Sequence, residues 1–185
     1  ATVSGGLLIL PILLVLAILV GVDNKGRIIF AHRRVGQNGK LFPCYKFQSM
    51  VPDAQERLEE YLAKNPEARK EWEESFKLTN DPRVTKLGAF LRKTSLDELP
   101  QLWNILKGTM SFVGPRPEWD ILAKDYARQI HYYNLRHLIK PGITGWAQVM
   151  FPYGESLDDA KRKLEYDLYY LKHQDLILDV LIIVK

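Results

Sequence analysis

Cysteine is almost absent from this sequence of 185 residues, and several common catalytic signatures are missing too. The single cysteine, Cys44, excludes an intramolecular disulfide and a cysteine-cluster metal site, and it fits a reducing compartment. The four histidines lack the spacing of metal ligands, no glycine-rich phosphate loop occurs, and no serine stands in a nucleophile elbow. What remains for chemistry is one dense polar stretch, residues 92–101, followed by residues 114–117.

The composition is that of a globular chain with a mild excess of positive charge. It is 46% hydrophobic and 26% charged, with a formal net charge of +4, and its length allows one sizeable domain with its own core. The excess suits an anionic partner such as phosphates or lipid headgroups. A nucleic-acid module would gather basic and aromatic residues on one element, whereas acids and bases alternate over residues 67–77. We therefore expect no nucleic-acid partner.

An aliphatic run over residues 7–22 suggests contact with a membrane. It lacks the basic region and the cleavage site of a signal peptide. A spanning helix, a re-entrant helix broken at Pro11 and a buried soluble helix remain as alternatives. His32, Arg33 and Arg34 follow, and positive charge beside a membrane segment favours the cytoplasmic side. We therefore expect residues 1–22 to be embedded in the membrane and residues 23–185 to lie at its cytosolic face, in a chain that continues beyond both ends.

The residue pattern predicts an α+β fold that is mainly helical. Strand-type residues over 27–35 and 41–47 flank Asn38-Gly39, which is a strong hairpin signal. A short extended segment is expected over 111–114 and a structured turn over 141–146. One predicted helix carries Tyr166, Tyr169 and Tyr170, and it is expected either at a membrane interface or in the core. Interfacial amphipathic helices are expected at this helix or at the end of the chain. The predicted helices begin at Asp53 and at Asn65-Pro66 and cover 84–92, 99–106, 119–133, 157–171 and 176–184.

The adjacent acids Asp97 and Glu98 have two interpretations. Ser95 followed by Glu98 fits a capping box, in which both acids belong to the first turn of a helix. Pro100 then falls early in that helix, which costs a backbone hydrogen bond, so the box is imperfect. The other interpretation is that the two carboxylates divide the work on a phosphoryl group. One attacks phosphorus, and the other handles a proton or binds a divalent cation.

Such a site also needs cations for the phosphate oxygens. Arg92, Lys93, Arg116 and Lys140 are candidates, and the planar fork of arginine suits phosphate. Prolines on both sides of Arg116 would fix the direction of its backbone. Mg²⁺ fits a site of this kind, since it binds through one or two carboxylates together with substrate phosphates.

Five stretches together resemble the bacterial sugar transferase family, the monotopic phosphoglycosyl transferases. They are residues 95–101 (SLDELPQ), 104–108 (NILKG), 110–111 with 113–117 (MS, VGPRP) and 141–145 (PGITG). The resemblance covers nearly the whole chain. An insertion over 53–78 and the stretch 41–47 are similar to the large-type members, which transfer hexose 1-phosphate to undecaprenyl phosphate.

The resemblance implies an activity and a role for each residue. Asp97 would be the nucleophile that attacks the β-phosphorus of a UDP-sugar, and it would hold the phosphosugar covalently after UMP leaves. Glu98 would assist, either with Mg²⁺ as a metal ligand beside Asp97 or by taking the proton of the acceptor, undecaprenyl phosphate. Substrate phosphates would be bound by Arg92, Arg116, Lys46 and Lys140. The enzyme would act at the cytoplasmic face of the bacterial inner membrane, in contact with its lipids. The reaction would be the first membrane step in the synthesis of polysaccharides or glycoconjugates, such as exopolysaccharide and O-antigen.

Three positions depart from the family pattern. Leu10-Pro11 keeps the proline of the family's re-entrant helix but lacks its usual serine, and the resemblance still favours the re-entrant form. Gln48 replaces a basic residue, which removes one candidate anion contact. Lys140 replaces an arginine, which keeps the charge and loses the bidentate geometry.

The main alternative is a catalytically inactive membrane scaffold for glycan-assembly enzymes, and intact Asp97 and Glu98 argue against it. The sequence leaves the sugar and the oligomeric state open, with a homodimer among the states considered.

Overall fold

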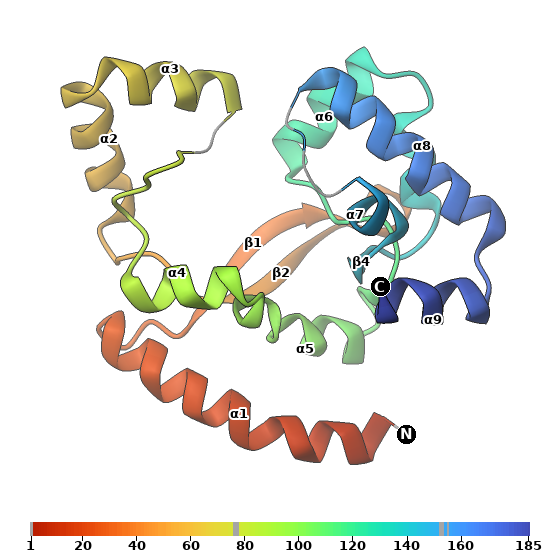
Figure 1. The fold of residues 1–185 in the computed structure, drawn as a ribbon, viewed down its shortest axis with the longest axis horizontal. Helices are drawn as coiled ribbons and strands as arrows, with labels where there is room; N and C mark the ends of the chain where they lie inside the picture. The colour runs from red at the N-terminus through yellow and green to blue at the C-terminus, as the bar shows by residue number, and fades with distance from the viewer. Residues whose placement is uncertain (1, 76–77, 152–153, 155) are drawn as a thin grey trace. The chain divides into compact units, whose positions relative to one another are not determined.

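The computed structural model describes residues 2–75, 78–151, 154 and 156–185, and Figure 1 shows their arrangement along the chain. Helices predominate and the strands are short, which confirms the predicted α+β, mainly helical fold. The helices are α1 (Thr2–Asp23), α2 (Ala54–Lys64), α3 (Pro66–Ser75), α4 (Lys86–Lys93), α5 (Gln101–Leu106), α6 (Asp120–Gln129), α7 (Trp146–Met150), α8 (Leu157–His173) and α9 (Leu176–Val184). The strands are β1 (Ile29–Val35), β2 (Leu41–Phe47), β3 (Ser111–Val113) and β4 (Gly142–Thr144). Short 3₁₀ turns cover Gln37–Gly39, Leu96–Glu98 and Tyr133–Leu138.

The chain divides into two compact units, each of which is described by itself. Unit 1 comprises Ala1–Phe30 and Lys46–Pro100, and unit 2 comprises Ala31–Tyr45 and Gln101–Lys185. The boundary falls within β1 and β2, which pair as a two-stranded sheet. Their connection is the predicted Asn-Gly turn, where Asn38 has φ 55° and Gly39 has φ 73°. The hairpin prediction is therefore confirmed.

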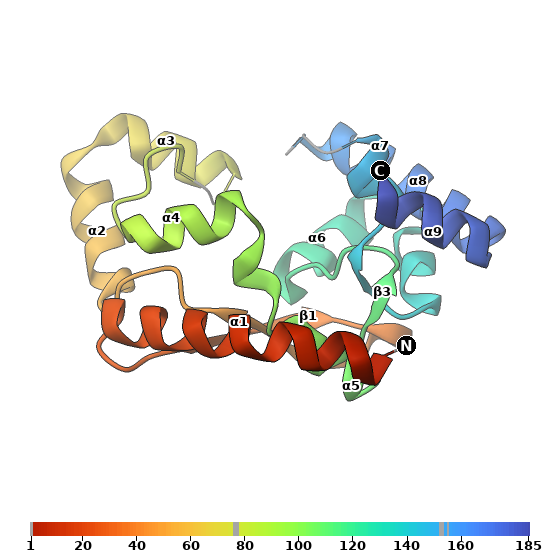
Figure 2. The same ribbon diagram turned by 60° about the horizontal axis from the view of Figure 1, so that its bottom comes forward.

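In unit 1, α1 packs against α4, and Figure 2 shows α1 running beneath α4 in that view. Leu16 and Val20 of α1 are buried with Phe47 of β2 and Leu91 of α4. The other side of α1 stays apolar and exposed. The exposed side chains there are Leu10, Ile12, Leu14, Val15, Ile18, Leu19 and Val22.

The break expected at Pro11 is not confirmed, because α1 continues as one helix from Thr2 to Asp23 with Pro11 inside it. Proline removes one backbone donor from a helix, and the surrounding turns keep theirs. A helix with the length and apolar content of a membrane span is not found among the described residues.

In unit 2, β3 pairs with β4 in parallel, with Ser111 opposite Gly142 and Val113 opposite Thr144. The two strands approach very closely at their ends. A Cβ at Gly142 would collide with the backbone nitrogen of Gly114, and a Cβ at Gly114 would lie 2.5 Å from the carbonyl oxygen of Lys140. Glycine is therefore required where the stretches 113–117 and 141–145 meet. The extended segment predicted over 111–114 is confirmed as β3, whereas residues 141–146, predicted as a structured turn, contain the strand β4 and the first residue of α7.

Two helix predictions in unit 2 need correction. The helix expected over 119–133 ends at Gln129, and a 3₁₀ turn follows after Tyr132, whose φ is 62°. Residues 146–150 form α7, which the sequence did not predict. The tyrosine cluster on α8 divides between the two environments considered for it. Tyr170 is buried with its hydroxyl 2.6 Å from Asp179 Oδ1, whereas Tyr169 is exposed and stacks on His173.

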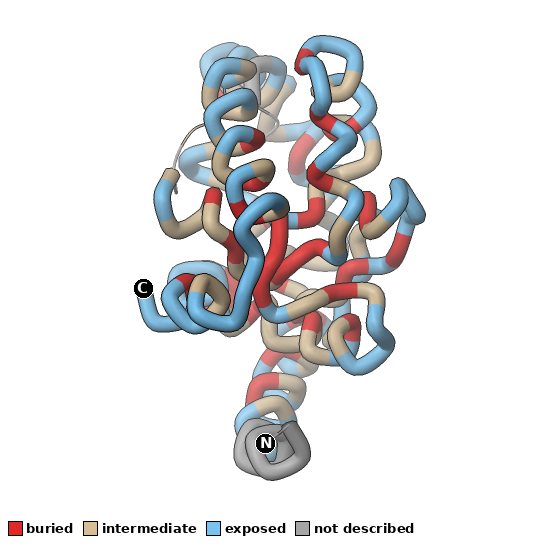
Figure 3. The backbone as a smooth tube through the Cα atoms, turned by 90° about the vertical axis from the view of Figure 1, so that its right-hand side faces the viewer, coloured by how far each residue is buried: buried red, intermediate tan, exposed pale blue. Residues whose placement is uncertain are grey.

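Exposure of the final helix, α9, is also uneven. Figure 3 shows most of this helix, next to the label C, in the colour of exposed residues. Ile182 is buried with Val113 and Tyr170, whereas Leu176, Ile177 and Val184 are each about four-fifths exposed (79%, 81% and 80%). The helix therefore anchors to unit 2 through one side and presents aliphatic side chains on the other.

Candidate active site

The two adjacent acids lie in a 3₁₀ turn directly after α4. Ser95 has φ 56°, a left-handed conformation that turns the chain between the end of α4 and Leu96–Glu98. Leu96 and Leu99 pack on the core formed with Phe47 and Leu91. Because these leucines face inward, the turn carries Asp97 with them, and Asp97 is only 7% exposed.

The capping interpretation of Ser95 and Glu98 is wrong. The Ser95 side chain makes no cap hydrogen bond, and only its carbonyl oxygen accepts from the Glu98 amide, at 3.1 Å. The left-handed backbone at Ser95 differs from the extended backbone that an N-cap serine adopts. Helix α5 begins only at Gln101, after Pro100. The two carboxylates are thus held by tertiary packing, and helix capping does not account for them.

Lys46 lies between the two carboxylates. Its Nζ is 2.6 Å from Glu98 Oε1 and 3.8 Å from Asp97 Oδ2. The side chains of Lys46, Asp97 and Glu98 are 22%, 9% and 13% exposed, so water screens their charges only in part. One ammonium group therefore offsets the repulsion between two carboxylates that stand side by side.

Arg92, on the last turn of α4, is held by Ser49. Its Nε donates to Ser49 Oγ at 2.9 Å. Partial burial lowers the pKa of the Arg92 guanidinium, and the carboxylates of Asp81 and Asp97 oppose this shift. Asp81 is itself engaged by Arg83, whose Nε and Nη2 lie 2.8 and 2.6 Å from its two oxygens. Arg92 is therefore a positive charge that Ser49 holds in place and that interacts electrostatically with Asp97.

Ser49 also determines how closely α4 approaches. Its carbonyl oxygen accepts from the Thr85 amide at 3.2 Å, just before α4 begins. A Cβ at Gly88 would collide with that oxygen and would lie 2.7 Å from the carbonyl carbon. The glycine therefore lets the helix rest directly on the backbone of Ser49, and this contact sets the position of Arg92.

Arg116 and Lys140 belong to unit 2. Arg116 is exposed, and Pro115 and Pro117 on either side of it are buried. Hydrogen bonds to four consecutive carbonyl oxygens hold this segment. The donors are Gly142 N to the Pro115 oxygen (3.0 Å), Arg136 Nη2 to the Arg116 oxygen (3.0 Å), Arg34 Nη1 to the Pro117 oxygen (3.2 Å) and Val35 N to the Glu118 oxygen (3.0 Å). The expectation that this backbone is fixed in direction is thus supported, with hydrogen bonds added to the effect of the prolines.

Lys140 is exposed and lies near the end of α5. Its Nζ would be 3.7 Å from a Cβ at Gly108, the residue that closes that helix with φ 73°. A cation at this end of a helix interacts favourably with the helix dipole. The structure thus brings together Lys46, Arg92, Asp97 and Glu98 in unit 1, and it places Arg116 and Lys140 in unit 2.

Sequence reasoning missed Ser49 in unit 1 and the pair Arg136 and Asp167 in unit 2. Arg136 Nη2 is 2.8 Å from Asp167 Oδ2, across 31 positions of the sequence. Neither pattern nor spacing relates these residues, because α8 meets the turn Tyr133–Leu138 only in the folded chain.

The donor set suits a divalent cation that also binds substrate. No group of three or more His, Cys, Asp or Glu side chains that could hold a metal occurs among the described residues. Asp97 and Glu98 offer carboxylate oxygens from two adjacent residues. Mg²⁺ typically uses one or two carboxylates and completes its coordination with water and phosphate oxygens. Two carboxylates without a third ligand therefore fit Mg²⁺ better than a metal that needs an all-protein cage.

Comparison with known proteins places these residues in context. A family model described as bacterial sugar transferase matches residues 1–185. The chain is 50% identical over 162 residues to the undecaprenyl-phosphate galactose phosphotransferase of Salmonella typhimurium, covering 88% of this chain and 33% of that protein. It is 46% identical over 178 residues to the UDP-galactose-lipid carrier transferase of Erwinia amylovora, covering 96% and 36%.

A third relative is the UDP-glucose:undecaprenyl-phosphate glucose-1-phosphate transferase of Escherichia coli, with 40% identity over 179 residues, covering 96% of this chain and 35% of that protein. The chain thus spans about a third of the length of these curated relatives. The match over the full chain and the identities confirm the resemblance seen in residues 95–117 and 141–145: the chain belongs to the bacterial sugar transferase family.

Proposed function

We propose that this chain is the catalytic part of a phosphoglycosyl transferase that moves a sugar 1-phosphate from a UDP-sugar to undecaprenyl phosphate. The observation that carries the proposal is the buried Asp97 beside Glu98, with Lys46 Nζ between them. Membership of the family and the names of the relatives support the donor and the acceptor. A catalytically inactive scaffold would have no need of two carboxylates held together away from water.

The reaction proceeds in two steps that share one phosphorus atom. An Asp97 carboxylate oxygen attacks the β-phosphorus of the UDP-sugar, and the bond from that phosphorus to the oxygen bridging the two phosphates breaks. UMP leaves with the electron pair, and the phosphosugar stays on Asp97 as an acyl phosphate. A phosphate oxygen of undecaprenyl phosphate then attacks the same phosphorus and releases Asp97 with a lipid diphosphate sugar as the product.

The neighbouring charges support these steps. Lys46 keeps Asp97 and Glu98 side by side, because its Nζ lies 3.8 Å from Asp97 Oδ2 and 2.6 Å from Glu98 Oε1. Glu98 takes the proton of the acceptor phosphate. Arg92, Arg116 and Lys140 bind phosphate oxygens and offset the charge that builds up as the donor is cleaved. Asp97 and Glu98 would hold Mg²⁺, which would polarise the phosphoryl oxygens of the donor.

The exposed apolar side of α1 supports a place at the membrane. Large contiguous apolar surfaces mark sites of contact with proteins or membranes, and α1 exposes Leu10, Leu14 and Ile18 by 64%, 63% and 59%. The acceptor is itself a membrane lipid. We infer that α1 contacts one leaflet of the membrane through this exposed apolar side, that the site faces the cytoplasm of the bacterial cell, and that the reaction is the first membrane step of glycan synthesis.

A turnover assay tests the proposal. The purified full-length protein is incubated with Mg²⁺, undecaprenyl phosphate and each of a panel of UDP-sugars, and UMP and the lipid product are quantified. At least one donor is expected to give both products, and Asp97→Asn is expected to abolish both. Asp158→Asn is the matched control, because the Asp158 side chain is 85% exposed on α8 and lies outside the site. Absence of UMP and lipid product with every donor would support the scaffold alternative.

A further inference from the structure

Arg136 is a buried arginine that none of the proposed steps uses. Its side chain is 6% exposed, and Asp167 of α8, 2% exposed, lies 2.8 Å from its Nη2. Burial alone would lower the pKa of Arg136, but the carboxylate of Asp167 and the oxygens of Tyr133 and Glu118 raise the pKa above its usual value. The guanidinium is therefore charged at all physiological pH values.

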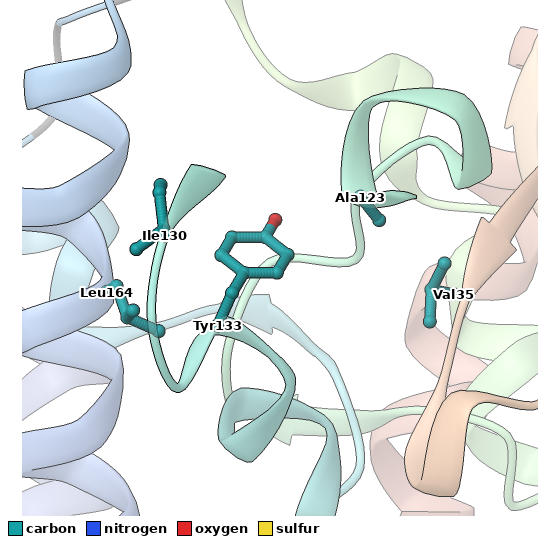
Figure 4. Packing of buried hydrophobic residues seen from close by; sticks show 5 residues of the cluster. All are labelled: Val35, Ala123, Ile130, Tyr133 and Leu164. Carbon is teal, nitrogen blue, oxygen red and sulfur yellow. The ribbon is translucent and has the colours of Figure 1, made fainter. Parts of the chain in front are cut away.

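The hydrogen bonds of Arg136 connect its own turn, Tyr133–Leu138, with the segment that carries Arg116. Nη1 donates to Tyr133 Oη at 2.7 Å, and Nη2 donates to the carbonyl oxygen of Arg116 at 3.0 Å. The Tyr133 ring lies in the middle of the core cluster, between Ile130 and Leu164 on one side and Ala123 and Val35 on the other (Figure 4). Arg136 thus links the Arg116 backbone to a tyrosine that is buried in the core of unit 2.

A buried ion pair of this kind is rarely kept for stability alone. The desolvation of two charges offsets much of their attraction, and well-packed apolar residues often serve as well. What an apolar residue cannot do is donate to the Arg116 carbonyl oxygen. Pro115 and Pro117 have no backbone donors, so regular strand pairing cannot hold this segment, and its carbonyl groups depend on donors from elsewhere.

We propose that Arg136, held by Asp167, is a positioning residue that fixes the backbone of Arg116 and so aims its guanidinium at the substrate phosphates. This inference rests on the proposed function, because it gives Arg136 its role through the phosphate contact of Arg116. The planar fork of Arg136 is needed, since two ion pairs, with Asp167 at 2.8 Å and with Glu118 at 4.0 Å, and two hydrogen bonds share its two terminal nitrogens.

A double-mutant cycle tests the proposal in the full-length protein. Arg136→Met is combined with Asp167→Leu, so that no lone charge stays buried, and the pair is made in the wild-type and in the Arg116→Ala background. The donor KM and kcat are measured from UMP release. In the wild-type background kcat/KM is expected to fall about 10²-fold, because a displacement of about 1 Å at a reacting group costs roughly that much. In the Arg116→Ala background the same pair is expected to cost less than about threefold.

Two further variants separate positioning from folding. Arg136→Lys keeps a charge opposite Asp167 but replaces the fork by one ammonium, and it is expected to lower kcat/KM with a thermal midpoint close to that of wild type. Tyr133→Phe removes the Nη1 acceptor and leaves the bond to Arg116, so its kcat/KM is expected to change less than that of Arg136→Lys. An equal loss from the Met/Leu pair in both backgrounds, or an Arg136→Lys variant with full activity, would overturn the proposal.

Failure of the proposed function has a different signature. In that case wild type itself releases no UMP, or Arg116→Ala is as active as wild type. Hydrogen exchange at the Arg116 and Glu118 amides then still reports on the segment, and it is expected to be faster in Arg136→Lys than in wild type. Unchanged exchange at both amides would contradict the role of Arg136 whatever the reaction is.

Discussion

Gly88→Ala tests how the approach of α4 to Ser49 positions the candidate site. The added Cβ would collide with the carbonyl oxygen of Ser49 and lie 2.7 and 2.9 Å from its carbonyl carbon and Cα, below the 3.0 Å that real Cβ contacts respect. All three atoms belong to the backbone, so no change of rotamer relieves the collision. Helix α4 has to move away from Ser49, and Arg92 moves with it.

The magnitude follows from two opposing effects. Overpacking of this kind costs about 1–3 kcal/mol, whereas alanine gains about 1 kcal/mol over glycine inside a helix. Because backbone atoms cannot yield easily, we expect the upper part of the first range and a net loss of about 2 kcal/mol in the free energy of unfolding. A shift of roughly 1 Å in Arg92 is expected to lower the rate of UMP release by at least about tenfold.

Chemical denaturation in detergent measures the stability, and UMP release measures the activity. Gly21→Ala is the matched control, since it also lies in a helix and its Cβ would meet only the Ile28 side chain, at 3.4 Å. The control is expected to keep full activity and to gain up to about 1 kcal/mol. A Gly88→Ala variant as stable and as active as wild type would show that the contact between Gly88 and Ser49 does not position α4.

Three other changes test single features of the site and its surroundings. Lys46→Met is expected to lower UMP release at least about tenfold, because Asp97 and Glu98 then repel each other without a cation, and Lys46→Arg is expected to retain more activity than Lys46→Met. Ser95→Val is expected to destabilise the chain by about 1–2 kcal/mol in denaturation, because a β-branched residue at φ 56° is strained, whereas Ser95→Gly is neutral or stabilising. His137 is expected to make stability fall as the pH drops from 6.5 towards 4. Burial and the charge of Arg136 lower its pKa to about 4, so the unfolded chain binds the proton first.

Each of these has its own contrary result. Equal activity in Lys46→Met and wild type would remove the lysine from the site. Equal stability of the valine and glycine variants at position 95 would argue against the left-handed turn. For His137, the shift of its pKa from 6.5 to about 4 corresponds to at most about 3.4 kcal/mol at 1.36 kcal/mol per unit, and partial exposure reduces this to about 2 kcal/mol. The loss should disappear in His137→Phe, and a pH dependence that persists unchanged in that variant would assign it to other groups.

Local patterns predicted the elements that depend on neighbouring residues. Asn38-Gly39 gave the hairpin turn, since both residues adopt positive φ in the folded chain. The limits of such patterns are visible in two similar sequences. Ser156 and Asp159 form a complete capping box at the start of α8, whereas Ser95 and Glu98 form none. Packing of the partly buried Leu96 and Leu99 on the core decides the second case, and a pattern of four residues does not contain that information.

The candidate site was predicted by residue type, and its contacts were not. The family resemblance identified Asp97 and Glu98, but it assigned Lys46 to substrate phosphates, whereas the structure places its ammonium against both acids. Ser49 and Arg136 carried no signal, because each acts through a partner that is distant in sequence: Ser49 on Arg92, and Arg136 on the backbone of Arg116. Contacts of this kind arise only when packing brings the segments together.

Trapping the covalent intermediate tests the proposed role of Asp97 as the nucleophile. The full-length protein is incubated with a UDP-sugar that supports turnover, without undecaprenyl phosphate, and the peptide that contains Asp97 is analysed by mass spectrometry. One phosphosugar is expected on that peptide, with an equal amount of UMP released, and the adduct is expected to disappear when undecaprenyl phosphate is added. Turnover that survives Asp97→Asn, or a phosphosugar attached to any other residue, would contradict a nucleophilic role for Asp97.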